Sequence, residues 1–123
     1  MSIPNKYQAL HNFYSGFGVP AYEENSVPEN AKLPYITYEV ITSELAAQNV
    51  ALSCQIWDKS NSLKNLNTLT ESLSAALRNG AKLQCDDGYI MLYRGEPFAQ
   101  TRPSGERTIK AKYINITADY ITL

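Results

Sequence analysis

The clearest fold signal in this chain is a pair of alternating stretches, Leu33-Pro34-Tyr35-Ile36-Thr37-Tyr38-Glu39-Val40 and Leu52-Ser53-Cys54-Gln55-Ile56-Trp57-Asp58-Lys59-Ser60. Apolar side chains recur at every second position, which is typical of strands that bury one face. We therefore predict strands at residues 34–41 and 50–58. The alternation places Trp57 on the face opposite the apolar residues of its strand.

A helix is predicted directly after the second strand. Leucines recur there at three- and four-residue steps, and Asn79-Gly80 supplies a left-handed stop. The segment Ser60-Asn61-Ser62 offers candidate N-caps. The apolar stripe expected to lie on the sheet consists of Leu63, Leu66, Leu69, Leu73, Ala76 and Leu77.

The N-terminal part of the chain predicts a first helix at residues 3–17, with Pro4 in its first turn and glycines at its end. Residues 21–32 contain Pro28 and several Glu and Asn, and we expect a loop there because the segment is too polar for a strand.

The C-terminal part predicts three further strands, at residues 82–85, 89–94 and 107–122. Asp86-Asp87-Gly88 is a turn signal between the first two. Residues 95–105 are expected to form a long loop. The last strand should bury one face, made of Ile114, Ile116, Ala118 and Tyr120.

The 123 residues suit one domain with one core. The order α-β-β-α-β-β-β predicts an α+β fold for residues 1–123. We expect an antiparallel or mixed sheet of about five strands, with an N-terminal helix and a central helix packed on it. The predicted flexible loops are residues 23–33 and 95–105.

The composition is that of an ordinary globular protein, with 44% hydrophobic and 11% aromatic residues. No apolar run is long enough to cross a bilayer, and the first residues lack the pattern of a signal peptide. We therefore expect synthesis in the cytosol, with Cys54 and Cys85 as reduced thiols.

The sequence offers no catalytic constellation. His11 is the single histidine and has no partner at a metal or catalytic spacing. Asp86 and Asp87 precede a glycine, so a tight turn explains them better than a pair of catalytic carboxylates. We predict a protein that is not an enzyme, with no catalytic residues, no cofactor and no metal.

Two segments are candidates for protein contacts. Trp57 stands at the strand-to-helix junction, where it either closes the edge of the core or faces another subunit. The loop at residues 95–105 is longer than a hairpin requires, and is either a solvated loop or a contact arm. The candidate interface residues are Trp57, Arg94, Glu96, Phe98, Arg102 and Arg107.

The order and spacing of several segments resemble a known family. These segments are Phe13-Tyr14-Ser15-Gly16-Phe17-Gly18-Val19-Pro20-Ala21-Tyr22-Glu23-Glu24-Asn25-Ser26-Val27-Pro28, then Leu33-Pro34-Tyr35-Ile36-Thr37-Tyr38, Gln55-Ile56-Trp57-Asp58-Lys59-Ser60 and the late Ala118-Asp119-Tyr120. With the leucine-rich helix they look like the minor structural proteins of tailed bacteriophages, namely tail terminator, tail completion and head–tail joining proteins, also grouped as minor capsid proteins.

The resemblance implies a non-enzymatic virion protein of a phage or prophage. Such α+β domains assemble into rings, commonly hexamers, at the head-proximal end of the tail, where they stop tube growth and present a surface to the head connector. The implied partners are other copies of the chain, tail tube proteins and head connector proteins, with DNA only as cargo through the ring and no membrane. The implied location is the virion, assembled in the host bacterial cytoplasm.

An alternative is a nucleic-acid-contacting accessory protein. Its basis is a local basic cluster of Arg94, Arg102, Arg107, Lys110 and Lys112. Within a ring these residues would line a channel for DNA. A formal net charge of −1 argues against this as the main function, because little counterion release is available to drive binding.

Overall fold

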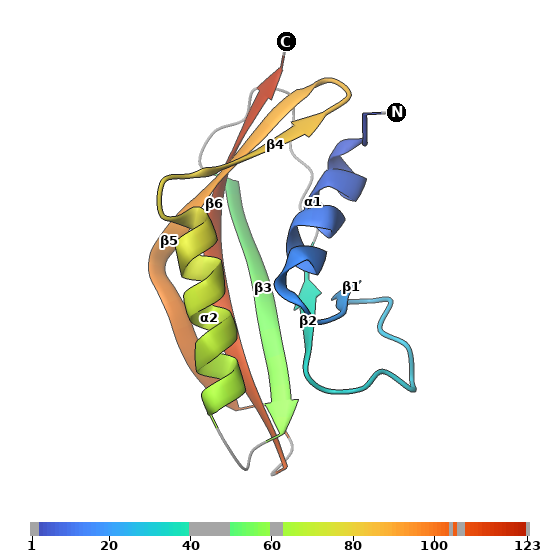
Figure 1. The fold of residues 1–123 in the computed structure, drawn as a ribbon, viewed down its shortest axis with the longest axis vertical. Coiled ribbons are helices and arrows are strands. Elements are labelled where there is room, and N and C mark those ends of the chain that lie inside the picture. The colour runs from blue at the N-terminus through green and yellow to red at the C-terminus, as the bar shows by residue number, and fades with distance from the viewer. Residues whose placement is uncertain (1–2, 40–49, 60–62, 104, 106–107, 123) are drawn as a thin grey trace.

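The computed structural model describes residues 3–39, 50–59, 63–103, 105 and 108–122. The elements are α1 (Lys6–Tyr14), a short 3-10 turn (Ser15–Phe17), β1 (Ala21–Glu23), β2 (Tyr35–Tyr38), β3 (Val50–Lys59), α2 (Lys64–Leu77), β4 (Ala81–Cys85), β5 (Gly88–Pro103) and β6 (Ile109–Thr122). They form a single α+β domain with two helices on a six-stranded sheet, as the sequence predicts (Figure 1).

The sheet is mixed, in the order β1-β2-β3-β6-β5-β4. Only the β1–β2 pair is parallel, and all other neighbouring strands are antiparallel. The helix α2 lies along the middle of the sheet against β3, β5 and β6. The helix α1 packs on both β1 and β4, the two outermost strands, so the sheet curls around it.

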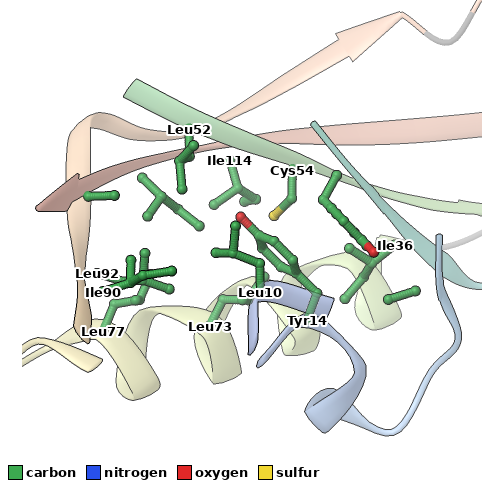
Figure 2. Packing of buried hydrophobic residues seen from close by; sticks show 14 of the residues in the cluster. Leu10, Tyr14, Ile36, Leu52, Cys54, Leu73, Leu77, Ile90, Leu92 and Ile114 are labelled. Atoms are coloured by element: carbon green, nitrogen blue, oxygen red, sulfur yellow. The ribbon is translucent and has the colours of Figure 1, made fainter. Parts of the chain in front are cut away.

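The core lies between the two helices and one face of the sheet. Leu10 and Tyr14 of α1 meet Cys54 and Ile114 of the central strands (Figure 2). Further along the sheet, the leucines of α2 cover the inner residues of β5. The predicted buried face of the last strand is confirmed, since Ile114, Ile116, Ala118 and Tyr120 are all buried.

The helix α2 confirms most of the leucine stripe. Leu66, Leu69, Leu73 and Leu77 are buried, and Gly80 has the expected left-handed conformation at φ +83°. Two members of the predicted stripe are wrong, because Leu63 is 41% exposed and Ala76 is also exposed. The predicted caps Ser60, Asn61 and Ser62 lie outside the described residues.

The first helix is shorter than predicted. It begins at Lys6, and the Asn5 side chain caps it by accepting a hydrogen bond from the Gln8 backbone N–H at 2.9 Å. Pro4 therefore precedes the helix instead of lying in its first turn. The end near Gly18, at φ +83°, is as predicted.

The predicted loop at residues 21–32 is wrong at its start. Ala21–Glu23 forms β1, which pairs in parallel with Ile36, Thr37 and Tyr38 of β2. Ala21 is buried in the core and Tyr22 and Glu23 are half-buried, although the strand lies at the edge of the sheet. Its formation depends on β2, which is distant in the sequence, and not on local propensity.

The predicted loop at residues 95–105 is also mostly strand. β5 continues to Pro103, and its pairing with β6 shifts register between Arg94 and Ala99. Arg94 opposes Ile116 and Ala99 opposes Ile114, so an enlarged bulge faces Asn115 alone. The Asn115 side-chain amide donates to the Pro97 carbonyl at 2.8 Å and holds the bulge.

Candidate functional site

The sheet has one face that no described helix covers. Both helices lie on the face formed by Leu52, Cys54 and Ile114, so the alternate residues point to the other side. We call this second side the open face. On it Tyr35, Trp57 and Ala111 lie in one row across β2, β3 and β6.

Trp57 is half-buried at the centre of that row, on the face that the sequence predicts. Its indole N–H donates to the Thr37 hydroxyl oxygen at 2.9 Å, which fixes the orientation of the ring. The neighbouring Thr37 and Ala111 are buried, at 5% and 4% exposure. Trp57 is therefore a rigid part of the surface and has a defined shape to offer a partner.

A hollow of about 340 Å³ opens beside Trp57. We call it the Trp57 pocket. It lies where β2 and β3 meet the segment that follows β1, and Tyr22 packs edge-on against Tyr35 at a ring distance of 5.7 Å. Its lining residues are Glu24, Asn25, Val27, Tyr35, Thr37, Gln55 and Trp57.

The rim of the Trp57 pocket is held by Glu23. Its carboxylate accepts from the Asn25 backbone N–H at 3.1 Å, from the Asn25 side-chain amide at 3.2 Å and from the Ser26 hydroxyl at 3.3 Å. The Glu24 backbone N–H also donates to the Tyr38 carbonyl at 2.9 Å. These bonds position Glu24 at the rim with its side chain exposed.

The rim is electrostatically negative. Partial desolvation, followed by the negative charges of Glu39 and Glu23, raises the pKa of Glu24. Glu24 makes no ion pair with any residue in the part of the chain that the structure describes. Negative charge beside aromatic walls is the chemistry that attracts a cationic side chain.

The Glu96 and Phe98 side chains of the bulge differ in how far they are exposed to solvent. Glu96 is exposed. Phe98, the other candidate contact residue of this segment, is half-buried and packs against the core. The register shift that turns it inward is not visible in local sequence periodicity.

The structure does not bring the residues of the predicted basic cluster together on the face that carries Trp57. Arg94 donates from its guanidinium to the Ser74 hydroxyl at 3.2 Å, and the Lys112 ammonium donates to the Asn67 side-chain oxygen at 3.3 Å. Both therefore reach α2, on the face opposite Trp57. For Arg102 only the backbone is described, paired with Ala111.

Arg107 lies outside the described residues. Lys110 is partly buried, and its backbone pairs with Asp58 of β3 and Pro103 of β5.

The residues considered for chemistry have structural contacts. His11 Nδ1 hydrogen-bonds with the Tyr38 hydroxyl at 2.8 Å, and its Nε2 with the Ser15 hydroxyl at 3.3 Å. Asp86 and Asp87 form the predicted turn between β4 and β5. Cys54 and Cys85 are free and buried.

The described residues contain no group of three or more His, Cys, Asp or Glu side chains arranged to hold a metal ion. Within the same part of the chain, no helix has the length and apolar character needed to cross a membrane.

Sequence reasoning found Trp57 but missed the pocket beside it. The alternation already placed Tyr35 and Thr37 on one face of their strand, and Gln55 and Trp57 on one face of theirs. Only the pairing register brings these four residues together. Glu24 was missed because its position depends on β1, which the polar sequence did not predict.

Comparison of the chain with protein-family models, with curated proteins and with solved structures finds no match.

Proposed function

We propose that this chain is a non-enzymatic structural protein of a tailed-phage or prophage virion. It forms a ring, with the hexamer as the expected size, at the head-proximal end of the tail, where it terminates the tail tube or joins the tail to the head. The observation that carries the proposal is the open face of the sheet, which presents a rigid aromatic pocket and further exposed aromatic and aliphatic side chains.

The open face has the composition of a protein contact surface. Besides Tyr35 and Trp57 at one side, Tyr93 and Ile121 are 39% and 46% exposed near the other side, on β5 and β6. Tyrosine and tryptophan are enriched where two proteins meet, because each combines a large apolar ring with a polar group that tolerates water. A second chain laid on this face would remove these rings from solvent.

The polar groups near the open face support a structural function. Tyr113 donates from its hydroxyl to Ser53 at 3.2 Å, and Trp57 donates to Thr37. Such bonds between neighbouring strands hold the surface in one shape. A rigid surface lowers the entropic cost of association, which a ring incurs at every contact.

The location at the tail comes from the sequence resemblance. The open face supplies the surface, and the resemblance supplies the assembly in which such a surface is used. Ring closure requires a heterologous contact, in which two different surfaces of the same chain meet at each interface.

The proposal is tested by deleting the gene for this chain in the phage or prophage that carries it. We expect electron microscopy to show tails of irregular length or heads without tails, and we expect the wild-type chain supplied in trans to restore normal particles. Variants His11→Gln and Asp87→Asn should restore them too. Normal, infectious particles from the deletion strain would contradict the proposal.

A further inference from the structure

The Trp57 pocket has the chemistry of a receptor for a single cationic side chain. Tyr35 and Trp57 provide aromatic walls, and Glu24 provides a carboxylate at the rim. An ammonium or guanidinium group gains from both, by attraction to the ring faces and by a charge-assisted hydrogen bond. At about 340 Å³ the hollow is near the lower limit of small-molecule sites, and is suited to one long side chain.

The charge around the pocket is unbalanced in the isolated chain. Glu23 and Glu39 lie near enough to Glu24 to raise its pKa, and no described basic residue forms an ion pair with Glu24. A cation placed at the rim would relieve this repulsion. The pocket is therefore complementary to positive charge as well as to the shape of a long side chain.

The chain carries such a cation at one end of its own sheet. Lys59 is the last residue of β3 and is exposed, two positions beyond Trp57 and on the same face. Its ammonium has no ion-pair or hydrogen-bond partner within the described part of the chain, and it does not pair with Glu24 of its own chain. Lys110 of β6 lies at the same end of the sheet, where its backbone pairs with Asp58 of β3.

We propose that the Trp57 pocket of one copy receives Lys59 of a second copy of this chain. The contact rests on the proposed ring-forming function and names the residues that join neighbouring subunits. The pocket and Lys59 lie close together on the open face, so every copy offers both. The contact propagates around a ring when each pocket receives Lys59 from one neighbour while the Lys59 of the same copy enters the pocket of the other neighbour.

Charge-reversal variants test the pairing. Self-association is measured by sedimentation velocity over a range of concentrations for the wild type, Glu24→Lys, Lys59→Glu and the double variant. We expect each single reversal to weaken self-association at least tenfold, because like charges then face each other across the contact. The self-association constant of the double variant should return to within about threefold of the wild-type value, because the pair is restored with its charges exchanged.

Two control variants carry the same changes of charge away from the open face. Glu71→Lys and Arg78→Glu alter exposed residues on and at the end of α2 and should self-associate like the wild type. Circular dichroism establishes that each variant is folded.

The possible results distinguish a failure of the Lys59 contact from a failure of the proposed ring. If the wild type self-associates but the single reversals do so equally well, or the double variant is no better than the singles, Lys59 does not occupy the pocket while the proposed function stands. If the folded wild-type chain remains a monomer at every concentration, both the contact and the ring are wrong.

Discussion

At the scale of single residues, the most unusual feature is a buried pair of tyrosines with unequal hydrogen bonding. Tyr14 and Tyr38 stack at a ring distance of 4.8 Å with 16° between their planes. The Tyr38 hydroxyl bonds to His11, whereas the Tyr14 hydroxyl is fully buried and finds no partner among the described residues. An unpaired buried hydroxyl loses its hydration without compensation.

Replacing the two tyrosines by phenylalanine should therefore have opposite effects. Tyr14→Phe removes an unsatisfied group and should leave the free energy of unfolding unchanged or raise it by about 1 kcal/mol. Tyr38→Phe removes the bond to His11 and should lower it by about 0.5–1.5 kcal/mol. Urea denaturation measures both, and a loss above about 1 kcal/mol for Tyr14→Phe would show that its hydroxyl is satisfied.

Because the Cys54 thiol is buried, we predict that the folded chain loses stability in alkali. Burial raises the pKa of this thiol to about 12 in the folded chain, while an unfolded cysteine ionises near about 8.5. The unfolded state therefore releases a proton first, and the stabilising contribution, complete below about pH 8.5, is lost as the pH rises toward about 12.

As the pH rises from about 8 to about 10.5, the urea concentration at the midpoint of unfolding should fall in both proteins. It should fall less steeply in Cys54→Ala than in the wild type, because the variant lacks this titration. The slopes therefore differ only by what depends on Cys54, namely its own titration and its electrostatic effect on the neighbouring Tyr14. Identical slopes would mean that the thiol is solvated in the folded state.

At the scale of elements, the helices and strands that could be predicted from the sequence are those with a long, regular pattern of apolar residues. The leucine steps of α2 and the alternation of β3 and β6 are repeated over many residues, so each element is over-determined. The strand β1 and the second half of β5 could not be found in this way. The first has three residues and exists only beside β2, and the second follows a bulge that resets the alternation.

The candidate site was predictable only in part for the same reason. Trp57 was found because its own strand fixes its face. The rest of the pocket is assembled from three segments whose register no single segment specifies.

The helix α2 predicts a clear contrast between its two sides. Leu73 is fully buried against the sheet, so Leu73→Ala should lower the free energy of unfolding by about 2–5 kcal/mol through lost burial and a residual cavity. The adjacent Ser72 is exposed, and Ser72→Ala should change stability by less than about 0.5 kcal/mol. Equal effects in chemical denaturation would mean that the helix is placed wrongly.

The bulge predicts a specific need for glycine. A Cβ on Gly95 would lie 2.9 Å from the Asn115 carbonyl carbon, so the backbone of β6 would have to move. We expect Gly95→Ala to cost about 1–3 kcal/mol. Gly16→Ala is the control, since a Cβ there meets nothing within 4 Å. If thermal denaturation shows that Gly95→Ala leaves the stability unchanged, the close approach of the two strands is contradicted.

At the scale of the whole molecule, the fold is a one-sided layer structure. Both helices and the core lie on one face of the sheet, while the open face carries Trp57, Tyr93 and Ile121 at the surface. Such a face is stable in water because its residues are only partly exposed, and it gains most when a second chain covers it. We infer that the open face takes part in the contacts through which copies assemble.

Trp57 provides the most direct test, because it is the single tryptophan of the chain and lies on the open face. Acrylamide quenching of its fluorescence is measured across concentrations at which sedimentation shows the chain passing from monomer to assembly. We predict that quenching falls as the assembly forms, because the partner shields the indole ring. An assembly in which Trp57 is quenched as readily as in the monomer would contradict the account.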